Sequence, residues 1–311
     1  MKIAIVGLGA LGITFATFLK NSGNTVYGII KKQHQEKFKN NLVKVVGIWG
    51  KHTAYLDQIN ISSNIKNYKF DLIIITVKSY DTKTALEQIE HLVGKDTLIL
   101  IAQNGFGNYE LAVEMFGKEK ILLSRVIFGA KLIDFNTSQI TVSTDVVRVG
   151  DPSKTIPTEK IINIVNTIKN SGIPTEYEPD VYQVLWDKIL YNCALNPLGA
   201  LLECTYGELS ENKSTRIIMN DIIKEIFSVI EKNKIFLKYK NYQEYLNFFY
   251  EKLIPPTSKH YPSMYYDLKK RKKTEIDALN GAIVNLAEKK GIKAPVNKTI
   301  TQLIKFKEIS K

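Results

Sequence analysis

The sequence predicts an α/β domain built on a doubly wound parallel sheet, followed by a domain made only of helices. Strand-like apolar runs alternate with helical patterns over residues 1–176, as a parallel sheet with helices on both faces requires. A glycine-rich turn, Gly7-Leu8-Gly9-Ala10-Leu11-Gly12, joins the first strand-like run to the first helical pattern. Residues 177–311 show helical periodicity and no convincing strand.

Composition limits the class of protein. The chain has 311 residues, of which 44% are hydrophobic and 24% charged, as in ordinary globular proteins with room for two cores. No apolar run approaches the roughly 20 residues of a membrane span, and no signal-peptide pattern precedes the first strand. Cys193 and Cys204 lie among apolar residues, so we expect buried free thiols. We therefore predict a cytoplasmic protein with no membrane partner.

The net charge of +12 favours anionic partners. The lysines are scattered and no nucleic-acid-reading motif accompanies them, so we expect small anionic metabolites and no nucleic acid. The four histidines show no ligand spacing, and no metal site is predicted.

The glycine-rich turn lies between a strand, Lys2–Val6, and a helix, and in this context G-x-G-x-x-G indicates a dinucleotide site. Gly7 permits the tight turn, Gly9 lets the backbone approach a pyrophosphate, and Gly12 lets the helix pack closely on the sheet. The pyrophosphate then binds at the helix N-terminus, where free N–H groups favour an anion. The alternative is a structural turn with no ligand.

The end of the second strand, Thr25–Ile30, indicates which dinucleotide binds. An NAD site has an acid there that accepts from the ribose 2′-hydroxyl. Here Lys31 and Lys32 follow the strand, and the first acid is Glu36. Two cations suit a 2′-phosphate, so we predict NADP. The missing acid also argues against a methyltransferase of similar fold.

Two more polar residues follow strand-like runs. Lys78 comes after Phe70–Val77, and Asn104 comes after Thr97–Ala102. Ligands of open parallel sheets bind beyond the carboxyl ends of the strands, so both residues are expected at the same crevice. Taken singly, each has a plainer interpretation, namely a solvated lysine and an Asn-Gly turn.

Other segments are predicted to complete the first domain. Val43–Trp49 and His52–Ile59 alternate in polarity and are expected to form a hairpin. The strand-like segments of residues 121–149 are expected to extend the main sheet. Pro174 and Pro179 punctuate the exit from this domain, whose boundary is placed between residues 176 and 177.

The helical half begins with a stripe of polar residues. Lys188, Asn192 and Asn196 recur at every fourth position in an otherwise apolar stretch, so they share one helix face. Buried polar groups need hydrogen-bond partners, and a bound polar ligand would supply them. The alternative is a stripe that faces solvent. Pro197 is expected to kink or end this helix.

A second helix start is predicted at Thr274, as an N-cap with Asp277 at N3. Glu275 then lies in a first helical turn, where the helix dipole favours any acid. The helix is expected to run to Lys289.

The residues resemble those of the ketopantoate reductases, the 2-dehydropantoate 2-reductase family, over essentially the whole chain. Six blocks carry the likeness: Gly7 to Gly12, Thr76-Val77-Lys78, Gln103-Asn104-Gly105, Leu185-Trp186-x-Lys188-x3-Asn192-x3-Asn196-Pro197-Leu198, Ser263-Met264-x2-Asp267 and Thr274-Glu275-Ile276-Asp277-x2-Asn280-Gly281. The resemblance implies a Rossmann domain at 1–176, an all-helical substrate-binding domain of the 6-phosphogluconate dehydrogenase type at 177–311, and an active site in the cleft between them. It also implies reduction of 2-dehydropantoate to (R)-pantoate by NADPH, in pantothenate and coenzyme A biosynthesis.

The resemblance also implies residue roles. Lys188 matches the proton donor, and Glu275 matches the acid that meets the cofactor and supports the catalytic site. The residues implied to bind substrate are Asn104, Asn192, Asn196 and Ser263, and those implied to bind cofactor are Gly7, Leu8, Gly9, Ala10, Leu11, Gly12, Lys31, Lys78, Asn104 and Glu275.

Two positions depart from the family pattern. Tyr206 stands where an Asn usually precedes Gly-Glu-Leu, and Lys31 stands where an arginine, with its bidentate fork, is common. Tyr206 keeps two alternatives open, a reductase of another 2-oxo acid and a non-catalytic NADP-binding sensor. The intact Lys188 and Glu275 argue against the sensor. The oligomeric state is left open, and an exposed apolar face on the helical domain would suit a homodimer.

Overall fold

The computed structural model describes residues 1–38 and 40–309. The chain forms two compact units: unit 1 contains Met1–Asn104 and Asn108–Tyr182, and unit 2 contains Gly105–Gly107 and Gln183–Lys311. The expected boundary after residue 176 lies inside the last strand of unit 1, Thr175–Tyr177. The chain first passes into unit 2 directly after Asn104, one of the residues predicted to contact ligands.

Unit 1 is built on an eight-stranded sheet in the order β12-β11-β8-β7-β6-β1-β2-β5. Its strands are β1 (Lys2–Val6), β2 (Thr25–Ile29), β5 (Gln58–Asn60), β6 (Leu72–Ile75), β7 (Leu98–Ile101), β8 (Ile121–Arg125), β11 (Val147–Gly150) and β12 (Thr175–Tyr177). All neighbouring pairs are parallel except β8 and β11. The strand order reverses between β1 and β6, so a topological switch point lies there.

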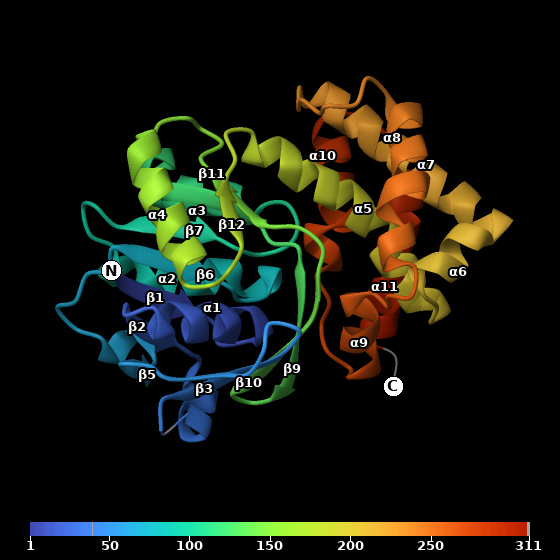
Figure 1. Ribbon diagram of the computed structural model, residues 1–311. Coiled ribbons are helices and arrows are strands. Elements are labelled where there is room, and N and C mark those ends of the chain that lie inside the picture. Colours follow the sequence, from blue (N-terminus) through green and yellow to red (C-terminus); the bar gives the residue numbers. More distant parts are fainter. Residues whose placement is uncertain (39, 310–311) are drawn as a thin grey trace. The chain divides into compact units, whose positions relative to one another are not determined.

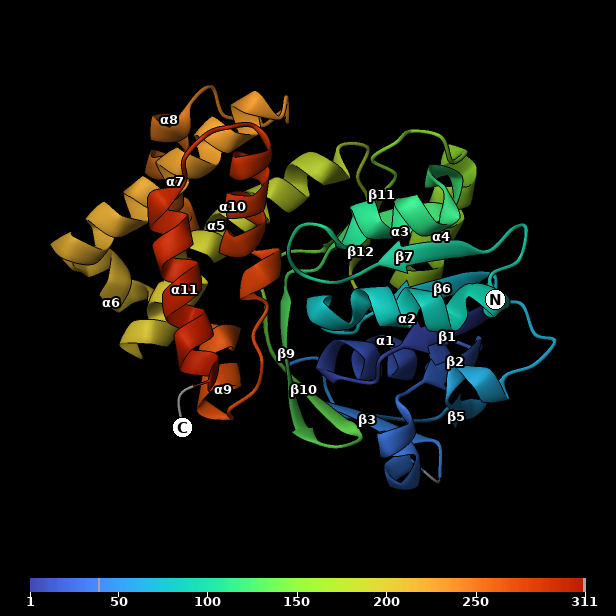
Figure 2. The same cartoon turned by 180° about the vertical axis from the view of Figure 1, so that it is seen from behind.

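Four helices cover this sheet: α1 (Ala10–Asn21), α2 (Thr82–Ile89), α3 (Asn108–Phe116) and α4 (Thr158–Asn170). Figures 1 and 2 show α1 and α4 on one face and α2 and α3 on the other. β6 and β7 are fully buried and apolar, as central parallel strands covered on both faces must be. The predicted doubly wound α/β fold is confirmed.

A second, four-stranded sheet in the order β4-β3-β10-β9 packs on the outer side of α1. Its strands are β3 (Leu42–Gly47), β4 (His52–Tyr55), β9 (Phe128–Asp134) and β10 (Thr137–Ser143). Because α1 has a sheet on each side, every residue from Gly12 to Leu19 is buried. Inside this sandwich the Thr14 and Ser138 hydroxyls lie 3.2 Å apart and share a hydrogen bond.

The second sheet corrects two expectations. Residues 121–149 do not all extend the main sheet, because β9 and β10 leave it and β10 pairs with β3. His52–Ile59 is two strands, and β5 joins the main sheet beside β2. The break is at Asp57, whose carboxylate accepts from the Val26 N–H and the Lys20 ammonium and so holds the chain out of the hairpin.

The regular elements of unit 2 are all helices in its described residues, as predicted. Its helices are α5 (Val181–Leu202), α6 (Tyr206–Glu211), α7 (Lys213–Lys232), α8 (Tyr242–Phe248), α9 (Ser263–Lys269), α10 (Asn280–Lys289) and α11 (Pro295–Ile309), with a π turn at Phe249–Leu253 and short 3-10 turns such as η8 (Ile276–Ala278). The first two residues of α5 are grouped with unit 1.

Pro197, expected to kink or end its helix, does not end it, because α5 continues to Leu202. A proline has no N–H, so the carbonyl four residues earlier, that of Cys193, loses its partner within the helix. Asn280 Nδ2 replaces the missing donor at 3.1 Å and also donates to Asn297 Oδ1 at 3.0 Å. Asn280 is fully buried, so this repair is made inside the core of unit 2.

The predicted helix start at Thr274 is also different in the structure. Thr274 accepts from the Ile276 N–H and donates through its hydroxyl to Glu308, and it precedes only the short turn η8. Asp277 forms an ion pair with Lys305 at 2.7 Å and caps nothing. The helix α10 begins after Leu279, whose φ of −109° and ψ of −110° break the chain direction.

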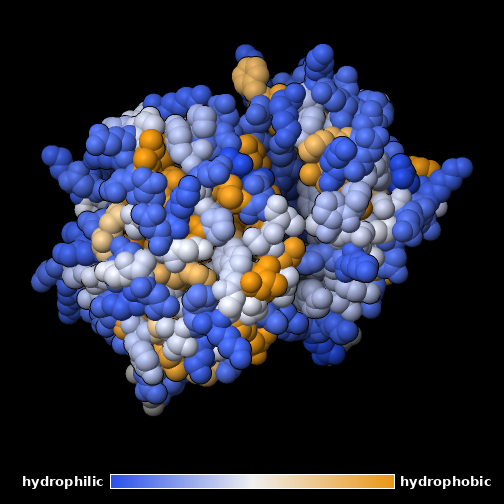
Figure 3. All heavy atoms as spheres, viewed as in Figure 1, coloured by the Kyte–Doolittle hydropathy of each residue, from blue (hydrophilic) through white to orange (hydrophobic). Residues whose placement is uncertain are grey.

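Hydrophilic side chains cover most of the molecular face visible in Figure 3, and hydrophobic ones occur there in smaller groups. Among residues 1–38 and 40–309, no helix has both the length and the apolar character of a membrane span.

Candidate active site

The glycine-rich turn follows β1 directly and leads into α1. Gly7 has φ +94°, and a Cβ there would lie 2.7 Å from Val77 Cγ1. A Cβ on Gly12 would lie 1.9 Å from the Gly7 carbonyl oxygen, so the first turn of α1 packs directly on the loop. Thr76 closes the arrangement, because its hydroxyl donates to the Gly7 carbonyl at 2.6 Å.

Gly9, by contrast, has no atom within 4 Å of an added Cβ. It is the N-cap residue of α1, it is exposed, and no side chain caps this helix end. No contact within the protein therefore requires a glycine at this position. The open space suits an anion that approaches the free N–H groups of α1.

The two glycines give a matched pair of variants. We expect Gly9→Ala to melt within about 2 °C of the wild type but to bind NADPH at least roughly tenfold more weakly, because its methyl occupies the place of the pyrophosphate. Gly12→Ala must displace the Gly7 carbonyl and should lose ~2 kcal/mol or more of unfolding free energy. Thermal melts and fluorescence titration with NADPH measure both, and normal NADPH binding by Gly9→Ala would contradict the site.

A hydrogen-bond network ties together the carboxyl ends of β6 and β7. Buried Gln103 donates through Nε2 to the Val77 carbonyl at 2.8 Å and to the Thr82 hydroxyl at 2.7 Å. Thr82 in turn donates to Asn108 Oδ1, and Asn108 Nδ2 donates to the Asn104 carbonyl. The network fixes the backbone that carries Lys78 and Asn104, which lie at adjacent strand ends as predicted.

These supporting residues were not predicted from the sequence. Thr82 and Asn108 open α2 and α3, where a polar residue looks like an ordinary cap. The available signal was that both, like Gln103, closely follow a strand that ends in a predicted ligand residue.

Lys31 lies just beyond β2, exposed, and its ammonium forms an ion pair with Asp81 at 2.8 Å. An exposed pair of this kind is worth ~1 kcal/mol or less, so Asp81 holds the lysine in place without preventing its exchange to a stronger anion. The adjacent Lys32 begins the 3-10 turn η1 (Lys32–Phe38) and is also exposed.

The polar stripe of α5 is not a solvent-facing one. Asn192 is 9% exposed and Asn196 is 7% exposed, and Lys188 is half-buried. Within the described part of the chain, the Asn192 amide and the Asn196 Nδ2 group have no hydrogen-bond partner. Neither amide nitrogen is among the fully buried atoms without a partner in the described residues, so both stay accessible to a ligand bearing oxygen acceptors.

Tyr206 reaches the same stripe from α6. Its side chain is 5% exposed, and its hydroxyl donates to Asn196 Oδ1 at 2.7 Å. Burial raises the pKa of this phenol well above its ordinary value, so it remains a donor. The ring packs edge-on against Tyr191.

Ser263 and Glu275 are held near α5 by their neighbours in sequence. Ser263 is the exposed first residue of α9, and the preceding Pro262 packs on Gly199 of α5, where a Cβ would lie 3.0 Å from its ring. Glu275 is half-buried and precedes η8, in the segment that Asn280 anchors to α5. All five predicted unit 2 residues thus lie on α5 or next to a segment that packs on it.

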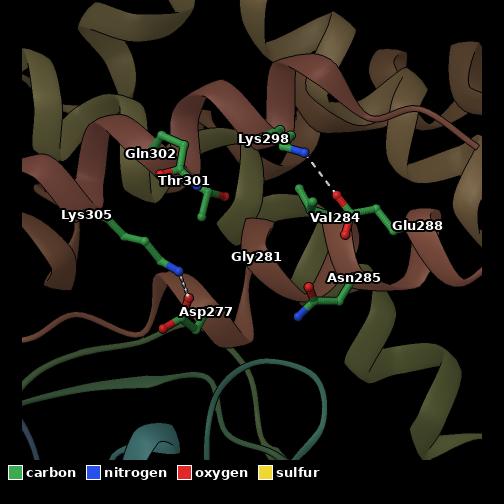
Figure 4. Close-up of a pocket in the computed structure, with 9 residues that line it drawn as sticks. All are labelled: Asp277, Gly281, Val284, Asn285, Glu288, Lys298, Thr301, Gln302 and Lys305. Carbon is green, nitrogen blue, oxygen red and sulfur yellow. Dashed lines mark hydrogen bonds and ion pairs between the residues drawn. The ribbon is translucent and has the colours of Figure 1, made fainter.

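A separate hollow of about 190 Å³ lies between α10 and α11 (Figure 4). Its charged residues neutralise each other, with Lys305 Nζ 2.7 Å from Asp277 Oδ1 and Lys298 Nζ 3.1 Å from Glu288 Oε1. None of the predicted site residues lines this hollow.

The cysteines differ from each other. Cys193 is buried, and desolvation raises the pKa of its thiol strongly, whereas Cys204 is only half-buried, contrary to expectation. Cys204 follows Glu203, which has φ +54° at the end of α5, and this turn brings the chain back toward the surface. No group of three His, Cys, Asp or Glu residues in the described ranges could hold a metal ion.

Comparison with known proteins gives one family for both halves of the chain. Residues 3–153 match the model of "Ketopantoate reductase PanE/ApbA", and residues 180–308 match that of its C-terminal domain. A 2-dehydropantoate 2-reductase from Aquifex aeolicus is 49% identical, over 99% of this chain and 97% of its own.

Solved structures share the fold of this chain. A PanE/ApbA family ketopantoate reductase from Ralstonia eutropha has a TM-score of 0.87 at 24% identity, over 99% of this chain and 98% of its own. D-mandelate dehydrogenase with NADH and anilino(oxo)acetate has a TM-score of 0.86 at 27% identity, with the same coverage. Both halves of the chain and its full-length relatives point the same way: the protein belongs to the ketopantoate reductase family of oxidoreductases.

Proposed function

We propose that this protein reduces 2-dehydropantoate to (R)-pantoate with NADPH, a reaction of pantothenate and coenzyme A biosynthesis. The observation that carries the proposal is the buried stripe on α5, where Lys188 stands in line with two amides whose donors lack acceptors. A small 2-oxo acid offers ketone, hydroxyl and carboxylate oxygens to these donors. The 49% identity to a named 2-dehydropantoate 2-reductase supports the choice of substrate.

The proposed chemistry divides between the units. NADPH, when bound at the glycine turn, supplies the hydride for the ketone carbon of the substrate. Lys188 enters as an ammonium and donates a proton to the ketone oxygen, where negative charge develops as the hydride arrives. Asn192, Asn196 and Ser263 orient the substrate.

Glu275 and Asn104 complete the proposed site. The Glu275 carboxylate meets the cofactor and supports Lys188, and the Asn104 amide contacts both ligands. Lys78, at the end of β6, contributes a cation to the cofactor.

We propose NADP over NAD because Lys31 and Lys32 follow β2, where an NAD site has an acid. We expect Lys31→Ala to raise KM for NADPH roughly tenfold, the equivalent of ~1.5 kcal/mol for one charge-assisted contact, and to leave KM for NADH nearly unchanged. Lys160→Ala is the control, because it also removes a unit 1 lysine from an exposed ion pair, with Asp96. Equal effects of Lys31→Ala on the two cofactors would refute the assignment.

The second candidate is a reductase of another 2-oxo acid. Tyr206 in place of the family's usual Asn favours it, and D-mandelate dehydrogenase shares the fold at 27% identity. The rate of NADPH oxidation should be compared for 2-dehydropantoate, pyruvate, 2-oxoisovalerate, phenylglyoxylate and a blank without substrate. Fastest turnover of 2-dehydropantoate supports the proposal, and fastest turnover of another acid supports the second candidate. Binding of NADPH with no turnover would favour a sensor.

A cytoplasmic location and a homodimer stay predictions from the sequence. Leu303, Phe306 and Ile309 are exposed along the end of α11 and would suit an interface between two copies. Sedimentation equilibrium measures the oligomeric state directly.

A further inference from the structure

Several hydrogen bonds fix the backbone on both sides of Tyr206. The start of α6 carries a complete capping box, in which Thr205 and Glu208 satisfy each other's backbone N–H groups. The Tyr206 N–H donates to the His260 carbonyl at 3.1 Å, and the Gly207 N–H donates to the Ser258 carbonyl at 2.8 Å. The phenol is therefore presented to Asn196 from a fixed backbone.

The hydrogen-bond inventory determines how Asn196 is oriented. A phenol has one proton, and the Tyr206 hydroxyl has no other acceptor among the described residues, so Asn196 must offer its oxygen to this buried group. With Oδ1 occupied, the amide directs its Nδ2 group away from Tyr206. A rotated amide would leave the phenol proton buried without an acceptor, at a cost comparable to the loss of a hydrogen bond.

We propose that Tyr206 is a positioning residue that holds Asn196 as a hydrogen-bond donor toward an oxygen of the 2-oxo acid substrate. This inference rests on the proposed function and adds a role for the residue that departs from the family pattern. Where the family usually has an Asn that contacts the substrate directly, Tyr206 would act on the substrate indirectly, through Asn196.

The orientation has a consequence for the substrate. Asn192, one turn earlier on α5, also has an amide group with no hydrogen-bond partner among the described residues. Asn196 and Asn192 can thus present N–H groups in line, and they suit a carboxylate or ketone oxygen that accepts hydrogen bonds. A substrate group that donates a proton to Asn196 Oδ1 would have to share that oxygen with the Tyr206 hydroxyl.

The test is Tyr206→Phe, which keeps the ring and removes only the hydroxyl. We expect kcat/KM for the 2-oxo acid to fall about tenfold, mainly through KM, with NADPH affinity unchanged. The matched control is Tyr191→Phe, which removes another hydroxyl of unit 2, one that is bonded to Thr257 at 2.6 Å and not to Asn196. Similar losses of stability in both variants with no kinetic difference would make Tyr206 merely structural and overturn the inference.

A double-mutant cycle separates positioning from direct contact with substrate. If Tyr206 acts through Asn196, Tyr206→Phe should change kcat/KM less than about twofold when Asn196 is already alanine. A full tenfold loss in that background would mean that Tyr206 has its own path to the substrate. Both kinetic outcomes are interpretable when each variant is soluble and melts like the wild type.

A binding measurement keeps this test distinct from that of the proposed function. In NADP-bound protein, pantoate should shift the Asn196 side-chain N–H resonances, which are assigned by their loss in Asn196→Ala, and Tyr206→Phe should broaden or move them. Turnover or binding by the wild type with no effect of Tyr206→Phe overturns this inference alone. If the wild type neither turns over nor binds any 2-oxo acid, the proposed function is overturned, and this inference is overturned with it.

Discussion

Lys188→Ala should lose roughly a hundred- to ten-thousand-fold in kcat, the range expected when a general acid is removed. Its affinity for NADPH should stay close to the wild-type value, because the glycine turn and Lys31 belong to the other unit. Stopped-flow NADPH oxidation and fluorescence titration measure the two quantities. A variant with near-normal turnover would remove Lys188 from the proposed mechanism.

Two further substitutions define what the lysine supplies. Lys188→Arg keeps the positive charge but gives up a proton far less readily, so it should restore substrate affinity more than turnover. Lys298→Ala is the control for loss of a lysine from unit 2, because its partner Glu288 lies in the separate hollow. With the wild type, turnover should also decline as alkaline pH removes the ammonium proton.

The second large effect is on stability. Asn280→Leu should lower the free energy of unfolding of unit 2 by ~3 kcal/mol, because it leaves the Cys193 carbonyl and Asn297 Oδ1 buried without a donor. Urea unfolding followed by Trp186 fluorescence, with Trp49 changed to Phe, reports on unit 2 alone, since Trp186 is fully buried there.

A Pro197 variant tests whether Asn280 compensates for the missing N–H of the proline. Replacing Pro197 with alanine restores the N–H that α5 lacks, so the Cys193 carbonyl regains a partner within the helix. In the Pro197→Ala background, Asn280→Leu should therefore cost measurably less than in the wild type. Strict additivity would show that Asn280 does not compensate for the proline.

The fold class and the glycine turn could be predicted because their signals are local. An apolar run that ends in G-x-G-x-x-G, or a lysine and two amides at every fourth position, specifies its own conformation and face. The second sheet could not be predicted in this way. β3 pairs with β10 across about 90 residues, and either strand could equally have joined the main sheet.

The errors in unit 2 have the same origin. Pro197 reads as a helix end until Asn280, far along the chain, is seen to replace the missing donor. Thr274 reads as a helix cap until Glu308 is seen to accept its hydroxyl. The contact of the Tyr206 hydroxyl with Asn196 likewise could not be foreseen from the sequence. Each correction depends on a partner that sequence spacing cannot identify.

The second sheet also sets an order for synthesis and folding. The outer face of α1 is covered by strands drawn from residues 42–55 and 128–143, and these pair across a long separation. Contacts of high sequence separation form late, and a chain emerging from the ribosome lacks them altogether. The helix behind the glycine turn therefore lacks the part of its cover that β9 and β10 supply until residue 143 has been made. A nascent chain of this length is the stage at which chaperone binding and aggregation are most to be expected.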